Sequence, residues 1–266
     1  MRKGQLLGVG NTARVYEWGA SEAIKIFHLR EGAREEAMKE ARNAEIVSRL
    51  SVKAPRFSGM IEYEGKTCLL YEKVEGPTML EYIQPTKSDV TEYARLMAQL
   101  QAELHAAEFD VRPNLKFELA ARIRHTPVIA ESDKAAALGM LESLPEGNAL
   151  CHYDLHPGNI ILSPKGPVII DWMNALVGDP LADVARSFMM LSSSALPPQA
   201  PAWLTERALR DMFAEAYVVE YARLTGIDRS SLDGWLVPTL AARICEMRGQ
   251  EQVEIVNRLQ AAIHPS

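Results

Sequence analysis

Three oxygen-bearing side chains stand at defined spacing in the second half of the sequence. Asp154 and Asn159 lie in the string HYDLHPGN, residues 152–159, and Asp171 follows in the string IIDW. Carboxylate and amide oxygens are the hard ligands that Mg²⁺ prefers, and a further carboxylate can align a hydroxyl that accepts a phosphoryl group. The spacing Asp-x-x-x-x-Asn is that of a kinase catalytic loop. The pattern therefore predicts phosphoryl transfer, with Asp154 contacting the acceptor hydroxyl and Asn159 and Asp171 binding Mg²⁺. The alternative is an ordinary turn that needs Asp, Pro, Gly and Asn.

Two histidines flank Asp154 in this string. We expect His152 to be a buried brace for the loop rather than an acid or a base. His156 either approaches the transferring phosphate or only shapes the turn, and the sequence leaves both roles open.

A glycine-rich string near the N-terminus indicates where phosphates would bind. Residues 8–15, GVGNTARV, match G-x-G-x-x-G-x-V with Ala13 in the third glycine place. A dinucleotide fingerprint would continue into a helix, whereas β-type residues follow here. We therefore predict a hairpin that covers the ATP phosphates, in which Gly8 and Gly10 let the backbone approach and Val15 covers the adenine. An ordinary hairpin turn is the alternative.

Lys25 lies in the apolar strand-like string AIKIF, where a charge requires a partner. A lysine in this position can clamp the α- and β-phosphates while a glutamate on the following helix holds it. Glu36 and Glu40 stand one helical turn apart and are both candidates. We prefer Glu40 because it lies nearer the middle of the helix, although either side chain could instead be solvated.

The string LLYEKVEG, residues 69–76, ends the first part of the chain. Its extended backbone could donate and accept the hydrogen bonds of an adenine edge, and we place those contacts around Glu72 and Val74. A simple linker is the alternative.

The elements that must position these residues follow from periodicity and turn residues. We expect strands at 5–8, 13–18, 22–27, 57–63 and 66–73, one helix over 33–50, a hairpin of 159–162 with 168–170, and helices at 88–107, 117–124, 132–144, 201–225, 230–248 and 250–263. This order predicts an α+β fold with two lobes. Residues 1–76 would form a nucleotide-binding lobe of antiparallel sheet with one helix, and residues 77–266 a larger helical lobe with the catalytic loop and the acceptor site.

Composition limits the function classes. The net charge of −6 argues against a nucleic-acid partner, and no apolar run is long enough to span a membrane. Three separated cysteines, Cys68, Cys151 and Cys245, match no metal-ligand spacing and indicate a reducing compartment, so we expect a cytoplasmic protein. Residues 77–266 carry 24 acidic and 16 basic side chains, which favours a cationic acceptor unless these charges merely solvate helix faces.

Taken together, these strings resemble the aminoglycoside phosphotransferase family of the protein-kinase-like superfamily. The strings HYDLHPGNIIL and IDW carry the resemblance. The usual form has Gly where Tyr153 stands, a departure that leaves the catalytic roles intact. The resemblance implies that Asp154 is the catalytic base or hydroxyl-orienting group, that ATP and Mg²⁺ are used, with GTP left open, and that Asp183 braces the catalytic loop. It also leaves a weaker possibility that Asp179 binds substrate.

Two other functions compete with a small-molecule kinase. A non-catalytic nucleotide-binding module would use the same residues without transfer. A Ser/Thr protein kinase is disfavoured because only eleven residues separate Asp171 from Asp183, too few for a long activation segment.

Overall fold

The structure is a computed structural model that describes residues 2–107, 114–196 and 199–264. The chain divides into two compact units, one of residues 1–82 and 157–175 and one of residues 83–156 and 176–266. The sequence placed one boundary between residues 76 and 77. The observed division differs because it assigns residues 77–82 and 157–175 to the first unit.

Backbone hydrogen bonds explain why residues 157–175 belong to the first unit. The amide of Leu162 donates to the carbonyl of Pro77 over 2.9 Å, and the amide of Ile169 donates to the carbonyl of Lys53 over 2.7 Å. These two bonds tie a segment from the middle of the chain to backbone more than eighty residues earlier. Such long-range bonds leave no mark in local periodicity.

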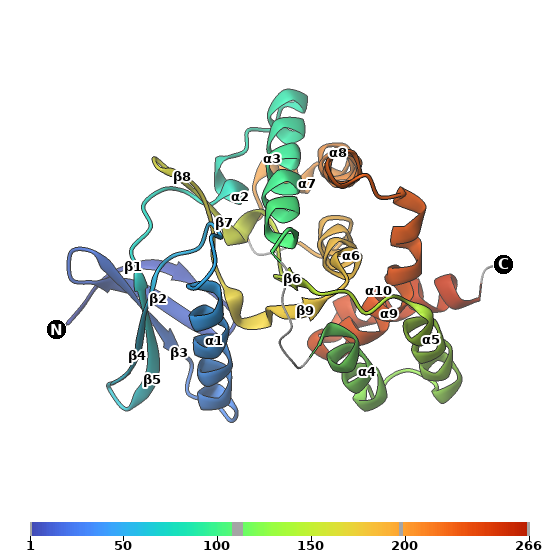
Figure 1. The fold of residues 1–266 in the computed structure, drawn as a ribbon, viewed down its shortest axis with the longest axis horizontal. Helices are drawn as coiled ribbons and strands as arrows, with labels where there is room; N and C mark the ends of the chain where they lie inside the picture. The colour runs from blue at the N-terminus through green and yellow to red at the C-terminus, as the bar shows by residue number, and fades with distance from the viewer. Residues whose placement is uncertain (1, 108–113, 197–198, 265–266) are drawn as a thin grey trace. The chain divides into compact units, whose positions relative to one another are not determined.

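The first unit contains a five-stranded antiparallel sheet in the order β1-β2-β3-β5-β4 (Figure 1). Its strands are β1 (Lys3–Val9), β2 (Ala13–Trp18), β3 (Glu22–Phe27), β4 (Phe57–Tyr63) and β5 (Lys66–Glu72). The same unit holds α1 (Ala33–Val47), α2 (Met79–Tyr82), the 3-10 turns η1 (Pro157–Asn159) and η2 (Trp172–Asn174), and the hairpin β7 (Ile160–Ser163) with β8 (Gly166–Ile169). The predicted strands and the predicted hairpin are confirmed.

Strand β3 shows how alternation places a charge inside this unit. Ile24 and Ile26 face one side of the sheet and pack with Trp18 and Cys68. Phe27, and with it Lys25, faces the opposite side, where Phe27 packs with alanines of α1. Lys25 is thereby directed toward the helix that carries the two candidate glutamates.

The second unit is mainly helical. Its helices are α3 (Lys87–His105), α4 (Leu115–His125), α5 (Glu131–Ser143), α6 (Pro180–Leu191), α7 (Ala202–Thr205), α8 (Arg207–Thr225), α9 (Asp233–Arg243) and α10 (Gly249–Ile263), with the 3-10 turns η3 (Arg229–Leu232) and η4 (Ile244–Glu246). A short antiparallel pair, β6 (Ala149–Cys151) with β9 (Leu176–Gly178), completes it. A sheet unit and a helical unit in one chain confirm the α+β class.

Two helical expectations were wrong in detail. The helix expected over 201–225 is broken at Glu206 into α7 and α8, and the one expected over 230–248 is divided among η3, α9 and η4. Helix α6 was not predicted at all. Nine of its twelve residues are buried, and these include Asp183, Arg186 and Ser187, which stand at helical spacing along one side of the helix.

Among the described residues, none of the helices combines the length and the apolar character that crossing a membrane requires.

Candidate functional site

Lys25 lies at the centre of a charge cluster in the first unit. Its ammonium nitrogen Nζ lies 2.8 and 2.9 Å from the two carboxylate oxygens of Glu40 and 3.0 Å from Oδ1 of Asp171. Glu36 instead pairs with Arg30 at 2.7 Å. The structure therefore selects Glu40 as the partner of Lys25.

Electrostatics keep this lysine charged. Burial alone would lower the pKa of Lys25, but Glu40 and Asp171 more than offset that effect, and the pKa lies above its ordinary value. Burial, together with the nearby Asp171 carboxylate, raises the pKa of Glu40, and Lys25 limits the rise. With both carboxylates ionised, one ammonium faces two negative charges. The cluster then carries a net charge of −1, which suits a further cation.

Two residues that the sequence did not single out hold this cluster in place. The Tyr71 hydroxyl donates to Oε1 of Glu40 over 3.0 Å. The Asn43 side-chain amide, on α1, donates to the carbonyls of Trp172 and Met173 over 2.9 and 3.2 Å. Helix α1 therefore fixes the backbone directly after Asp171. In the sequence, Asn43 could have been noticed as a polar side chain on the inward side of the predicted helix.

The β7–β8 hairpin brings the two predicted metal ligands to one end of the ladder. Asn159 precedes β7 and Asp171 follows β8, and the Ile170 amide donates to the Asn159 carbonyl over 3.0 Å. Asp171 has a φ of 66°, in the left-handed region. Strain of this kind at a non-glycine residue is common at functional sites.

The donor set at this end of the hairpin fits Mg²⁺. Mg²⁺ binds through one or two carboxylates with further oxygen donors. The Asp171 side chain is 34% exposed, so part of its carboxylate remains accessible beside Lys25. The Asn159 amide would supply the second protein oxygen.

The glycine-rich turn joins β1 to β2. The Gly10 amide donates to the Ala13 carbonyl over 2.9 Å, and Gly8 pairs with Val15 in the ladder. A Cβ added at Gly8 would meet no atom within 4 Å, and one added at Gly10 would lie 3.6 Å from the Ala13 carbonyl oxygen. The turn therefore has an open side along its backbone, and phosphate binding there stays a prediction.

Glu72, which we placed near adenine, is the last residue of β5. Its backbone amide already donates to the Arg56 carbonyl over 2.8 Å. Adenine contacts around Glu72 and Val74 stay a prediction, and any contact that requires an amide donor would have to come from another residue than Glu72.

In the second unit, the β6–β9 pair positions the start of the catalytic string. His152 and Tyr153 follow β6 directly, and both are fully buried. Their backbone amides each donate to the Asp183 carboxylate over 2.8 Å. Asp183, at the start of α6, therefore holds the backbone that leads into Asp154. This geometry agrees with the bracing role that the family resemblance implied.

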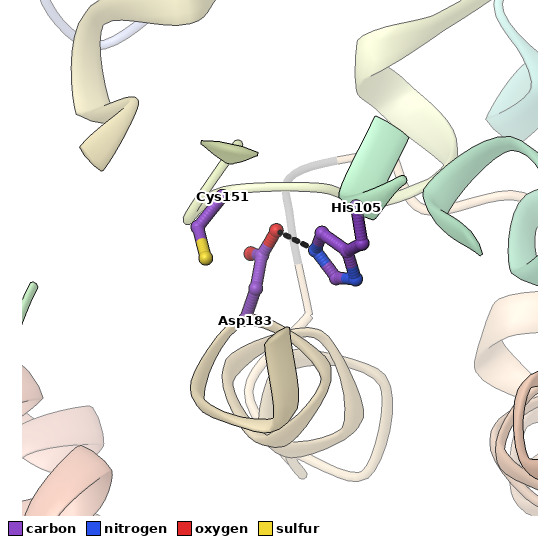
Figure 2. A group of neighbouring side chains, drawn as sticks. All are labelled: His105, Cys151 and Asp183. Carbon is purple, nitrogen blue, oxygen red and sulfur yellow. Dashed lines mark hydrogen bonds and ion pairs between the residues drawn. The ribbon is translucent and has the colours of Figure 1, made fainter. Parts of the chain in front are cut away.

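His105 supports Asp183 from α3. Its Nε2 lies 3.0 Å from the Asp183 carboxylate (Figure 2). Its Nδ1 lies 2.7 Å from the Tyr221 hydroxyl. Burial by itself would raise the pKa of Asp183, but the hydrogen bond to His105 and the electrostatic effect of the neighbouring histidines outweigh it, and the pKa lies below its ordinary value. Asp183 is thus an ionised acceptor.

Cys151 lies beside the same pair, so that His105, Cys151 and Asp183 offer ligand atoms within 4.8 Å of one another (Figure 2). Both Asp183 oxygens already accept backbone amides. Burial also raises the pKa of the Cys151 thiol well above its ordinary value, which keeps it protonated. His105 and Asp183 therefore form a hydrogen-bonded support, and the Cys151 thiol beside them donates to the carbonyls of Ala149 and Asp179.

Asp154 has a neighbour that the sequence did not reveal. Arg186 Nη2 lies 3.5 Å from Oδ1 of Asp154, whose side chain is 26% exposed. Arg186 also binds Glu246 in a bidentate pair at 3.1 and 2.7 Å, and its guanidinium lies 4.7 Å from the centre of the Tyr153 ring. Glu246 and Asp154 raise the pKa of Arg186 in spite of its burial. Asp154 thus stands beside a permanent positive charge.

Asp179 has a structural use. It is the N-cap of α6, where its side chain accepts the Leu181 amide over 2.8 Å. This bond accounts for the residue without substrate binding, which was the weaker possibility for it.

Comparison with known proteins places the chain in one family. Residues 3–226 match the sequence model of the phosphotransferase enzyme family. No curated protein sequence matches at a significant level.

Solved structures show the same fold at low identity. An aminoglycoside-3'-phosphotransferase of type VIII is 20% identical with a TM-score of 0.62 over 90% of this chain and 93% of that one. A macrolide 2'-phosphotransferase from Brachybacterium faecium is 17% identical with a TM-score of 0.54 over 98% and 91%. An amicoumacin kinase in complex with AMP-PNP and Ca²⁺ is 13% identical with a TM-score of 0.63 over 97% and 87%. The expected protein-kinase-like fold is confirmed.

Proposed function

Because the chain belongs to the phosphotransferase enzyme family, we propose that it transfers the γ-phosphoryl group of ATP to a hydroxyl of a small molecule, with Mg²⁺ as the metal. The observation that carries this proposal is the buried Lys25 held by Glu40 and Asp171 at 2.8 to 3.0 Å. A fixed cation next to an accessible carboxylate suits a metal-bound triphosphate.

Each residue has one task in this reaction. Lys25 binds the α- and β-phosphates, and Glu40 keeps its ammonium in place. Asn159 and Asp171 hold Mg²⁺, which when bound neutralises charge on the phosphate oxygens. Asp154 accepts a hydrogen bond from the acceptor hydroxyl and orients it for attack. Asp183 keeps the backbone before Asp154 in position.

A small acceptor is favoured over a protein substrate. Only eleven residues separate Asp171 from Asp183 in the sequence, too few for a peptide-docking segment. The similar structures include enzymes named for aminoglycosides, macrolides and amicoumacin. One of the similar structures is a complex with GDP and another is a complex with AMP-PNP. ATP is therefore our first choice of phosphoryl donor, and GTP belongs in the test.

The test measures ADP or GDP release with a panel of hydroxylated acceptors. Asp154→Ala should lower turnover by about 10²-fold or more, the range for loss of an acid–base group, while Mg-ATP binding measured by calorimetry stays unchanged. Asp211→Ala, which removes an exposed carboxylate on α8, is the matched control. Failure of the wild type to bind Mg-ATP, or full turnover in Asp154→Ala, would reject the proposal.

A further inference from the structure

Three arginines gather around Asp154 and Glu246 in the second unit. Arg122 comes from α4, Arg186 from α6 and Arg243 from the last turn of α9, and α9 packs against both other helices. Three guanidiniums facing two carboxylates leave this group with a net charge of +1. An excess positive charge beside the proposed hydroxyl-orienting residue requires an explanation.

Two of the three guanidiniums are paired within the protein. Glu246 accepts from both Arg122 and Arg186, and Arg186 also reaches Asp154. Arg186 and Arg122 lower the pKa of Glu246 in spite of the raising effect of its burial. Glu246 is therefore ionised, and its two oxygens are taken by these partners.

Arg243 is different. Its partly buried guanidinium makes no hydrogen bond and no close ion pair with any residue that the structure describes, and the carboxylates of Glu246 and Asp154 act on it only from a longer distance. Burial lowers the pKa of Arg243, and Arg186 lowers it further. A guanidinium stays protonated at neutral pH even so. No nitrogen of this guanidinium is among the fully buried, unpaired side-chain atoms of the described residues, so it is open to solvent and accessible to an anionic ligand.

We propose that Arg243 binds an anionic group of the acceptor, so that the acceptor is a hydroxy acid whose carboxylate contacts Arg243 while a hydroxyl contacts Asp154. This inference rests on the proposed function and names its substrate class. Guanidinium and carboxylate form two parallel hydrogen bonds, which would orient the acceptor as well as attract it.

The acidity of residues 77–266 does not oppose this assignment. Surface charges act through solvent and are screened over about 8 Å at physiological ionic strength. A guanidinium in contact with the ligand acts over a few ångströms in a partly buried setting, where screening is weaker. The local excess of arginine therefore outweighs the distant excess of acidic side chains, and the expectation of a cationic acceptor is reversed.

The test uses three acceptors with the same carbon chain. D-Gluconate, D-glucitol and D-glucamine carry a carboxylate, a hydroxyl and an ammonium group at the same position. Their binding is measured by saturation-transfer NMR and by calorimetry on wild type, Arg243→Gln and Arg243→Lys. Arg207→Gln, at an exposed arginine of α8, is the matched control, and circular dichroism verifies that each variant is folded.

The wild type should bind gluconate at least ten-fold more tightly than glucitol and glucamine. Arg243→Gln should abolish that preference, Arg243→Lys should keep part of it, and Arg207→Gln should keep it all. Equal or tighter binding of glucamine, no binding of gluconate, or unchanged gluconate binding in Arg243→Gln would overturn the assignment.

Binding does not require turnover, so the two proposals can fail separately. Arg243-dependent gluconate binding without nucleotide release would contradict phosphoryl transfer alone. Turnover of glucamine in preference to gluconate would support transfer and refute the assignment of Arg243.

Discussion

Replacing Asp183 by Ala should destabilise the second unit more than any other single carboxylate change in that unit. The side chain is fully buried and accepts the amides of His152 and Tyr153 at 2.8 Å each, besides its bond to His105. Hydrogen bonds to a charged group contribute about 1.5–3 kcal/mol each. Losing both amide bonds should therefore lower the free energy of unfolding by about 3–6 kcal/mol. This is a large fraction of the roughly 5–15 kcal/mol that stabilises a typical protein.

Asp179→Ala is the matched control, because Asp179 also lies at the start of α6 but serves as a cap. Loss of a cap costs about 0.5–2 kcal/mol. Urea unfolding gives the free energy of each variant. Hydrogen exchange of the peptide that contains His152 and Tyr153 reports whether these two amides lose protection in Asp183→Ala. A cost below about 1 kcal/mol, or unchanged protection, would refute the bracing role.

The pH dependence has a definite sign. The pKa of Asp183 is lower in the folded protein than in the unfolded chain. The ionised carboxylate therefore contributes fully to folding stability above the unfolded pKa of about 3.9. That contribution is lost as the pH falls through the lower, folded value. The difference in stability between wild type and Asp183→Ala should therefore be constant near neutral pH and shrink below about pH 4. A difference that grew on acidification would contradict this.

Three further changes test individual positions within the two units. Lys25→Met leaves the buried Glu40 without its cation and should cost about 3–5 kcal/mol in urea unfolding; a cost within 0.5 kcal/mol of zero, on the order of a surface change, would argue against the pair. Gly147 has a φ of 67°, and a Cβ added there would lie 2.3 Å from backbone atoms, whereas Gly226 has a φ of 73° and open space around an added Cβ. Thermal melting should therefore show that Gly226→Ala loses about 1–2 kcal/mol of stability and that Gly147→Ala loses more. The Thr239 hydroxyl lies near the buried Tyr153 hydroxyl, but neither makes a hydrogen bond of good geometry within the described residues. Tyr153→Phe should therefore be neutral or raise stability by about 1 kcal/mol, and a clear loss in the same melting assay would contradict this.

Local patterns predicted well how the candidate residues of the first unit lie relative to one another. Alternation along β3 places Lys25 on the face that meets α1, and the central position of Glu40 on that helix favoured it over Glu36, which pairs with Arg30. The predicted hairpin likewise explains how Asn159 and Asp171 come to one end of a ladder. In each case the signal lay within a strand, a helix or a turn, where periodicity determines direction.

The residues around Asp154 could not be predicted in the same way. Arg186 and Glu246 are sixty residues apart and lie in separate elements. Arg186 lies in α6, a helix that was not predicted from the sequence. Neither residue belongs to a motif with known spacing. Pairing of this kind depends on how helices pack, which no local pattern encodes.

Tyr153 connects the sequence with this unpredicted environment. Its φ of 58° lies in the left-handed region, which explains why the family resemblance led us to expect glycine at this position. A non-glycine residue in that conformation costs about 1–2 kcal/mol. In return the ring is fully buried and lies under the guanidinium of Arg186, which also contacts Asp154. Burying a ring of this size contributes more than the strain costs. The departure from glycine therefore gives Arg186 an aromatic surface to pack on, and it links the backbone conformation of the catalytic string to the position of the charge beside Asp154.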